Sequence, residues 1–383
     1  MSLSRLRADT NLLAEVHGRG NVKHAVADDR SCLKALLGAA GCGFIALMPA
    51  IADAHVKWFV DYNLLAPPRP ALAVVSGYYF VTFCLFLGPL MFAVALLDRY
   101  LTRRECLLHR GANRISERVS PYFPLVLRVG VSAFFTAVFV FGCLGESMIL
   151  TPELHTHQAW ICWFQLAIAI AVLVPRTVAL AAAGIVFLYA YGVIEYGLYH
   201  MLDYPIFVGV AAYLMLWSVY GERKRDLADN ILRIAAGVTL LWASIEKFAF
   251  PEWSFILLAQ RPGMTLGFNP ELYMVAAGFI EFCAAYLLIT GLLSARFAAL
   301  LLFVMFVSAI VPFGRLDAVG HSVIIVVLLL LALGNNVVGM RLDAPKSVAA
   351  TATLHTSAFF VTLLIFVGLY YAGYYASFPH TPA

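Results

Sequence analysis

The sequence predicts an all-α polytopic membrane protein with about 11 transmembrane helices. Of its 383 residues, 62% are hydrophobic and only 13% are charged, whereas soluble domains carry about 45–50% apolar and about 25% charged residues. This composition excludes an ordinary soluble enzyme, a nucleic-acid binder and a disordered chain. The apolar residues also gather in runs of about 20 residues, the length that crosses a bilayer as a helix.

Charged residues, prolines and glycines separate these runs and define the expected spans. They are 34–54, 72–97, 124–150, 159–174, 177–199, 204–221, 229–250, 270–293, 297–316, 319–339 and 358–377. The fourth run is short, so we expect it to be tilted or to turn at Pro175 and Arg176 within the headgroup layer.

The distribution of basic residues predicts the orientation. With a cytoplasmic N-terminus, 21 of the 26 Lys and Arg lie on the inner side, many of them in the polar tail 1–33 and the basic loop 98–120. This asymmetry follows the positive-inside rule. An odd number of spans then places the C-terminus in the periplasm of a bacterial inner membrane.

The first run has a second interpretation. Ala52-Asp53-Ala54 is an A-x-A pattern of the kind that signal peptidase cleaves. Cleavage there would make His55 the N-terminus, where its amine and ring could bind copper together. The preceding polar tail is long for a signal peptide, so we expect a plain first helix.

Recurring polar landmarks predict a tandem repeat. Leu127-Arg128 and Leu232-Arg233 are 105 residues apart, and His200 and His321 are 121 residues apart. We therefore expect two four-helix units in the same orientation. The predicted organisation is a cytoplasmic tail (1–33), two N-terminal helices with a basic loop (34–120), the first unit (124–221), the second unit (229–335), and a cytoplasmic loop with the last helix (336–383).

Motifs of the second unit resemble those of the DoxX-like membrane proteins. The similar segments are Arg233-Ile-Ala-Ala-Gly with Trp242-Ala-Ser-Ile-Glu-Lys-Phe, Gly278-Phe-Ile-Glu, Gly291-Leu-Leu-Ser-Ala-Arg and Gly320-His321. The sequence departs from the family after Glu281, where the usual small-residue pair is replaced by Phe282-Cys283-Ala284-Ala285. The resemblance implies a four-helix membrane bundle that is sometimes a subunit of a quinone- or thiol-linked oxidoreductase, and it implies no single activity.

Acidic residues and histidines gather in the outer half of the predicted bundle. The acidic residues are Asp53, Asp61, Glu146, Glu153, Glu195, Asp203, Glu246, Glu252, Glu271, Glu281 and Asp317, and the histidines are His55, His155, His157, His200 and His321. Ionisable groups within a membrane are costly and usually functional. We therefore expect an outward-facing site made of histidines and carboxylates.

Two kinds of site are possible within this set. For a metal, His155 and His157 alternate in an extended loop and could share an ion, while His200 and Asp203 form an i, i+3 pair in which Asp203 could orient the ring. His55 and His321 complete the candidate metal ligands, although a histidine such as His321 could equally cap a helix entrance.

For proton or redox chemistry, the candidate catalytic residues are Glu281, His321 and Lys247. Glu281 lies near mid-membrane and requires a partner, for which Lys247 and His321 are the candidates. Adjacent Glu246 and Lys247 point about 100° apart, so one must reach another neighbour. Glu195 and Glu146 are the candidate cofactor-binding carboxylates.

Two outer segments carry further expectations. His55-Val-Lys57-Trp58 is expected to lie at the membrane interface with an aromatic anchor. The apolar segment 251–262 is too short to cross the bilayer and is bracketed by prolines, so we expect a helix that covers the outer mouth of the second unit.

These observations leave three hypotheses. The first is a DoxX-like membrane component of a quinone- or thiol-linked redox system, with a periplasmic or membrane redox protein as partner. The second is a Cu or Zn binding or transport protein, and the third is a non-catalytic assembly partner. The sequence contains no phosphate-binding loop, nucleophile elbow or zincin helix, and its seven cysteines lack CxxC spacing. Quinone and Cu or Zn are the candidate cofactors, and the lipid bilayer is the surrounding medium.

Overall fold

The computed structural model describes residues 56–59, 66–104, 107–145, 147–265, 267–334 and 347–378. The predicted tail, the first span with its cleavage site, His55, Glu146 and most of the loop after the second unit lie outside the described residues.

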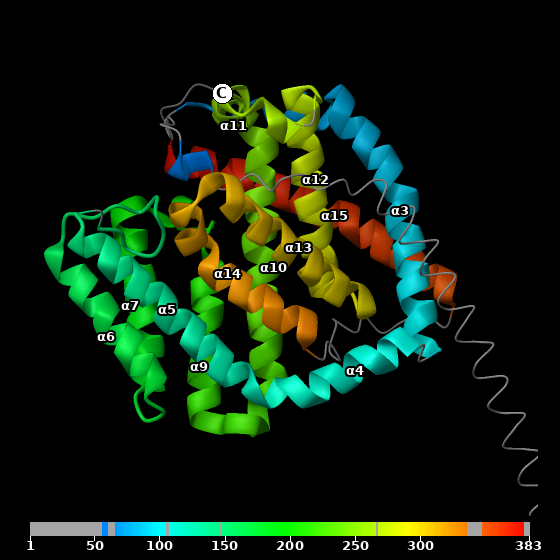
Figure 1. Ribbon diagram of the computed structural model, residues 1–383. Coiled ribbons are helices and arrows are strands. Elements are labelled where there is room, and N and C mark those ends of the chain that lie inside the picture. Colours follow the sequence, from blue (N-terminus) through cyan, green and yellow to red (C-terminus); the bar gives the residue numbers. More distant parts are fainter. Residues whose placement is uncertain are drawn as a thin grey trace, which may run out of the picture.

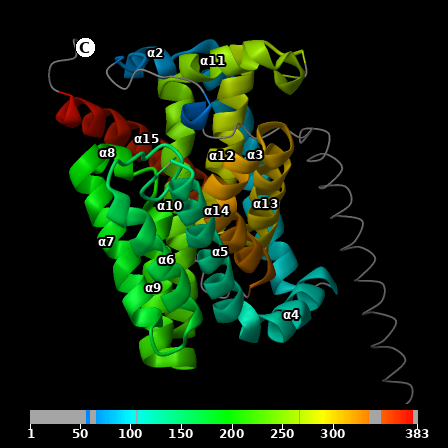
Figure 2. The same ribbon diagram turned by 60° about the vertical axis from the view of Figure 1, so that its left-hand side comes forward.

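The described residues confirm an all-α polytopic membrane protein, with a single isolated bridge between Met148 and His155 as their only β pairing. The long helices are α3 (Tyr78–Arg103), α5 (Phe123–Cys143), α6 (Ala159–Leu173), α7 (Val178–Tyr196), α9 (Pro205–Tyr220), α10 (Arg225–Ala249), α12 (Pro270–Thr290), α13 (Leu293–Phe313), α14 (Arg315–Leu333) and α15 (Val348–Ser377). Their arrangement is shown in Figures 1 and 2.

Within the described residues, eight helical stretches are long and apolar enough to cross a membrane. This number differs from the predicted 11 for three reasons. The first span is not described, α6 is short as expected, and one stretch, 205–249, contains two predicted spans that η3 (Gly221–Lys224) joins.

The long helices form two groups of four that pack in the same cyclic order. In the first group α5, α6, α7 and α9 contact one another in sequence, and α9 returns to α5. In the second group α10, α12, α13 and α14 repeat this pattern. Contacts between α9 and α10 and between α5 and α14 join the groups, while α3 and α15 pack on the second (Figure 1).

Glycines allow the two groups to approach closely. A Cβ atom at Gly130 would lie 2.8 Å from the side chain of Val326 on α14, and one at Gly209 would overlap the Cβ of Ala235 on α10. Membrane helices lack a hydrophobic force between them and associate through such close packing of small residues. The contact between the groups therefore depends on these two glycines.

We call the end of the bundle that carries α11 (Pro251–Gln260) the upper end and the opposite end the lower end, as drawn in Figures 1 and 2. The upper end is the one predicted to be outside. At this end the third helix of each group stops at a glycine with positive φ, Gly197 (83°) or Gly314 (75°), a conformation that glycine adopts without strain. The chain then turns towards His200 in one group and His321 in the other.

At the lower end, the predicted basic loop is largely helical. Helix α4 (Leu107–Val119) crosses the lower end between α3 and α5 (Figure 1). Its strong amphipathic pattern, with arginines every fourth residue, explains the helix that we did not predict. The Asn113 side chain accepts a hydrogen bond of 3.0 Å from Arg296 on α13 and so attaches α4 to the second group.

Candidate functional site

A buried lysine lies at the centre of the upper end. Lys57 belongs to the short helix η1 (Val56–Trp58), and its side chain is only 3% exposed. Its Nζ atom lies 2.6 Å from Glu246 and 2.8 Å from Asp203, and Glu153 is 3.7 Å away. Lys57 and Trp58, which we predicted to lie at the membrane interface, are buried within the protein, where carboxylates from both helix groups surround the ammonium.

We name Lys57, Glu153, His200, Asp203 and Glu246 the Lys57 cluster. Glu153 comes from the loop between α5 and α6, and Glu246 comes from the last turn of α10. His200 lies on α8 (Leu198–Met201), and Asp203 follows it in the turn before α9. The cluster thus joins the first group to the second through a residue that belongs to neither.

The loop that carries Glu153 is held in place by hydrogen bonds within its backbone and from a side chain of α6. The Ile149 amide donates a 2.7 Å hydrogen bond to the Leu154 carbonyl. From α6, the Gln165 side-chain amide donates to the carbonyls of Met148 and Ile149 at 2.6 and 2.8 Å. These bonds satisfy buried carbonyl groups and fix the direction of the loop. Glu153 is therefore presented to the interior although it lies outside a helix.

Glu153 has further partners besides Lys57. Its carboxylate contacts His200 Nε2 and accepts a 2.5 Å hydrogen bond from the Tyr204 hydroxyl. Burial tends to raise the pKa of Glu153, but Lys57 and His200 outweigh burial and hold the pKa below its ordinary value. Burial likewise opposes ionised Lys57, yet Asp203, Glu153 and Glu246 raise its pKa well above the ordinary value. Both groups are therefore charged at neutral pH.

The cluster contains more acid than base. Three carboxylates surround one lysine, which leaves two excess negative charges unless His200 and the carboxylates together hold two further protons. Excess charge is costly in a buried site. The Lys57 cluster is therefore an acidic site buried at the upper end.

Trp58, the next residue, packs against the second predicted histidine. Its ring centroid lies 4.5 Å from that of His321 on α14, and the ring centroid of Phe306 lies 4.7 Å from that of His321. His321 Nδ1 lies 3.0 Å from fully buried Asp317, one turn earlier on the same helix. A carboxylate in this position favours a proton on Nδ1 and fixes the ring orientation. Consecutive residues of η1 thus contact both histidine sites.

The predicted pairing of Glu281 is confirmed. Lys247 Nζ lies 2.6 Å from Glu281, which connects α10 to α12 within the second group. Adjacent Glu246 reaches Lys57 instead, as expected from their divergent directions on the helix. The predicted helix over the second unit is also present as α11, whose Trp253 ring lies 5.6 Å from Lys57 Nζ.

Several predicted site residues are not brought together. His155, His157 and Glu195 are exposed, and Asp203 pairs with Lys57 rather than orienting the His200 ring. The described residues contain no group of three or more His, Cys, Asp or Glu arranged to hold a metal ion. In the Lys57 cluster, the ammonium occupies the position between carboxylates that a cation would take.

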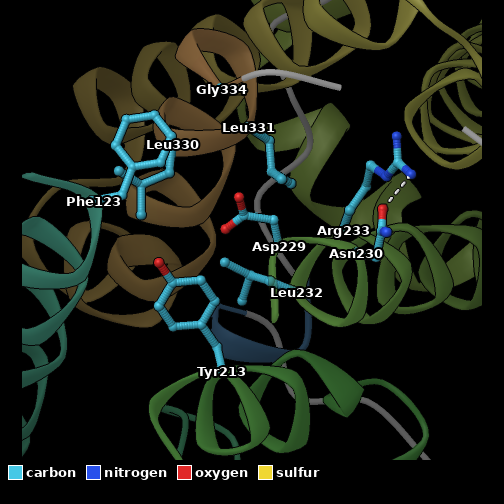
Figure 3. A pocket seen from close by; sticks show the side chains of 9 residues that line it. All are labelled: Phe123, Tyr213, Asp229, Asn230, Leu232, Arg233, Leu330, Leu331 and Gly334. Carbon is cyan, nitrogen blue, oxygen red and sulfur yellow. Dashed lines mark hydrogen bonds between the residues drawn. The ribbon is translucent and has the colours of Figure 1, made fainter. Parts of the chain in front are cut away.

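The arginine of the first family motif lies at the other end of the molecule. Arg233 lines a lower-end pocket of about 390 Å³, its open mouth included, and donates a 2.7 Å hydrogen bond to Asn230 (Figure 3). Phe123 and Tyr213 line it from the first group. This pocket is therefore separate from the Lys57 cluster.

Three members of the upper-end site were missed as site residues from the sequence: Lys57, Glu153 and Glu246. One signal was present, since Lys57 is one of only five basic residues in a predicted outer half that holds eleven acids. Such a cation is expected to be drawn into the acidic set rather than left at the interface.

The depressed pKa of Glu153 predicts sensitivity to acid. Its ionised form stabilises the folded state at neutral pH, and this contribution is lost as pH falls below its unfolded pKa of about 4.3 towards the lower folded value. We expect the melting temperature in detergent to fall between about pH 5 and pH 3, and to fall less in Glu153→Gln. Exposed Glu222→Gln is the control and should retain the wild-type profile. A wild-type profile in Glu153→Gln would contradict the assignment.

Comparison with known proteins supports the resemblance in the second group. Residues 228–315 match the model of the DoxX family. The match covers α10 to α13 and ends before Gly320-His321. No curated protein and no solved structure matches the chain. The chain is therefore a multi-pass membrane protein in which residues 228–315 are similar to the DoxX family.

Proposed function

We propose that this protein is the membrane component of a quinone-linked redox system, in which the upper-end residues exchange the protons that accompany electron transfer. The observation that carries the proposal is the burial of three carboxylates and a histidine around Lys57, directly beside the aromatic surroundings of His321.

The residues around His321 supply the kinds of group that a quinone site uses. A quinone carries two electrons together with two protons, so its site needs aromatic surface and groups that exchange protons. Trp58 and Phe306 supply the aromatic surface, and His321 supplies a titratable ring that Asp317 orients. Trp58 and Lys57 are consecutive residues, so the aromatic surroundings of His321 lie directly beside the Lys57 cluster.

Each part of the site has a separate task in this proposal. His321 exchanges a proton with the bound headgroup, and Asp317 positions it. The Lys57 cluster takes up the proton on a group other than Glu153, which stays ionised, while Lys57 reduces the mutual repulsion of the carboxylates. The electrons pass to a periplasmic or membrane redox protein, the partner expected from the family resemblance.

The other hypotheses have less support. A thiol-linked role would use the described cysteines, but Cys84, Cys143, Cys162 and Cys283 are free thiols on different helices. A Cu or Zn role would use His155 and His157, which are exposed and outside the Lys57 cluster. A purely structural role would make every upper-end substitution act on stability alone.

Quinone binding separates these alternatives. We titrate the purified full chain with decylubiquinone, follow tryptophan fluorescence, and extract co-purified quinone. Saturable binding is expected, and removal of a charged or hydrogen-bonding contact in His321→Ala or Asp317→Asn should weaken it by about tenfold or more. His355→Ala, which removes a lower-end histidine, should bind normally.

Two results would contradict the proposal. One is the absence of saturable binding to a correctly folded protein. The other is equal affinity in wild type, His321→Ala and Asp317→Asn. Stoichiometric Cu or Zn that is lost from a variant lacking both His155 and His157 would favour the metal hypothesis instead.

A further inference from the structure

The exposed surface of α4 carries a row of arginines. Arg110, Arg114 and Arg118 are four residues apart, so they lie along one stripe of the helix, and all three are exposed. Like charges at this spacing destabilise a helix unless opposite charges lie nearby. Exposed Glu117, three residues after Arg114, supplies one negative charge against these three positive ones, so the exposed surface of α4 is cationic overall.

The opposite side of α4 attaches it to the protein. Ser116 is 2% exposed, and Asn113 binds Arg296 on α13. Asn113 also lies 3.1 Å from His109 one turn earlier. Because these residues face the bundle, the arginine stripe necessarily faces away from it. The helix is thus held in a fixed rotation with its cationic side outward.

Apolar residues border the stripe. Leu107 and Ile115 are 57% and 51% exposed; Leu107, seven residues before Arg114, continues the arginine stripe at its N-terminal end, and Ile115 borders the stripe about 100° round the helix. Figure 1 shows α4 crossing the lower end, where transmembrane helices α3 and α5 end. An apolar edge next to a cationic stripe is the pattern of a helix that lies in the headgroup layer.

We propose that α4 binds anionic phospholipid headgroups, with Arg110, Arg114 and Arg118 contacting the phosphates and Leu107 and Ile115 entering the acyl region. Guanidinium groups match phosphate oxygens in geometry as well as in charge. The phosphate groups of the lipid complement the net positive charge of this exposed surface. This surface is at the opposite end from the Lys57 cluster and is independent of the proposed redox function.

Lipid counting on the full chain tests this proposal. The protein in nonionic detergent is titrated with phosphatidylglycerol or with phosphatidylcholine of the same acyl chains, and native mass spectrometry counts the bound lipid. We expect preference for phosphatidylglycerol. Each arginine near an anionic surface contributes about fivefold in affinity, so Arg110→Gln, Arg114→Gln and Arg118→Gln together should weaken binding by at least about tenfold.

Matched variants separate position from total charge. Arg176, Arg223 and Lys224 are exposed and predicted to be on the same side of the membrane but lie outside α4, and their joint replacement by Gln should weaken binding less than the α4 triple does. The triple Arg→Lys variant of α4 keeps its charge and should retain most of the affinity. If the triple Gln variant does not fold, Arg114→Gln alone should still show the fivefold loss.

The proposal is overturned if the two lipids bind equally. It is also overturned if the folded α4 variants bind phosphatidylglycerol like wild type, or if the control triple loses as much affinity as the α4 triple. Binding that is insensitive to raised salt would likewise contradict it, because exposed charge interactions are screened.

Discussion

Replacing Lys57 with methionine is expected to destabilise the protein by about 3–5 kcal/mol. The substitution keeps the apolar stem of the side chain but removes the ammonium, which lies 2.6 Å from Glu246 and 2.8 Å from Asp203. Carboxylates that lose a buried partner keep their desolvation cost without its compensation. The loss therefore exceeds that of a surface ion pair, which contributes about 0–1 kcal/mol.

Equilibrium unfolding in mixed micelles measures this loss. Lys224→Met removes an exposed lysine by the same chemical change and should alter the free energy of unfolding by less than about 0.5 kcal/mol. Lys57→Arg keeps the charge, so its free energy of unfolding should lie between those of Lys57→Met and Lys224→Met. A Lys57→Met protein as stable as wild type would show that the ammonium does not neutralise the cluster.

Replacing Trp58 with alanine is expected to cost about 3–5 kcal/mol, the usual range for a buried tryptophan. The ring is 9% exposed and packs against His321, and a side chain at Gly320 would overlap it. Such close complementarity prevents neighbouring groups from filling the space that the indole leaves. The cavity would also open the aromatic surroundings of His321, so quinone affinity should fall in parallel.

The same unfolding measurement checks the effect of Trp58. Trp160→Ala removes an indole that is 42% exposed on α6 and should cost much less. Gly320→Ala would place a methyl group against the Trp58 ring, and this overpacking should lower the free energy of unfolding by about 1–3 kcal/mol. Equal stability of Trp58→Ala and Trp160→Ala would contradict the packing of η1 against α14.

Much of the fold was predictable because a membrane-spanning helix requires about 20 consecutive, mostly apolar residues, a pattern that can be recognised in the sequence. Every predicted span that falls within the described residues coincides with a helix, including the short α6. The helix α4 was missed because its arginines were interpreted only as a topological signal. Its four-residue spacing was the evidence for a helix.

The candidate site was predictable only in part. The acidic and histidine-rich character of the upper end, the Lys247–Glu281 pair and the cover by α11 followed from local pattern. The partners of Lys57 did not, because Asp203 is 146 residues away in sequence and the intervening turns decide which acid reaches the lysine. A single sequence contains no signal for such distant pairing.

The two four-helix groups give η1 its position. We propose that they arose as a tandem repeat, since both pack in the same order and both place a histidine after a positive-φ glycine at the upper end. Two similar units leave a junction between them that neither can fill. Lys57 and Trp58 occupy it, one facing the acids of both groups and the other facing His321.

A double-mutant cycle on Lys57 and Glu246 tests this account most directly. Unfolding free energies are measured for wild type, Lys57→Met, Glu246→Gln and the double variant. If Lys57 is buried against Glu246, the coupling energy should exceed about 1 kcal/mol. The double variant should then lose less free energy of unfolding than the sum of the losses of the two single variants. Additivity within about 0.3–0.5 kcal/mol would contradict the central position of Lys57 between the two groups.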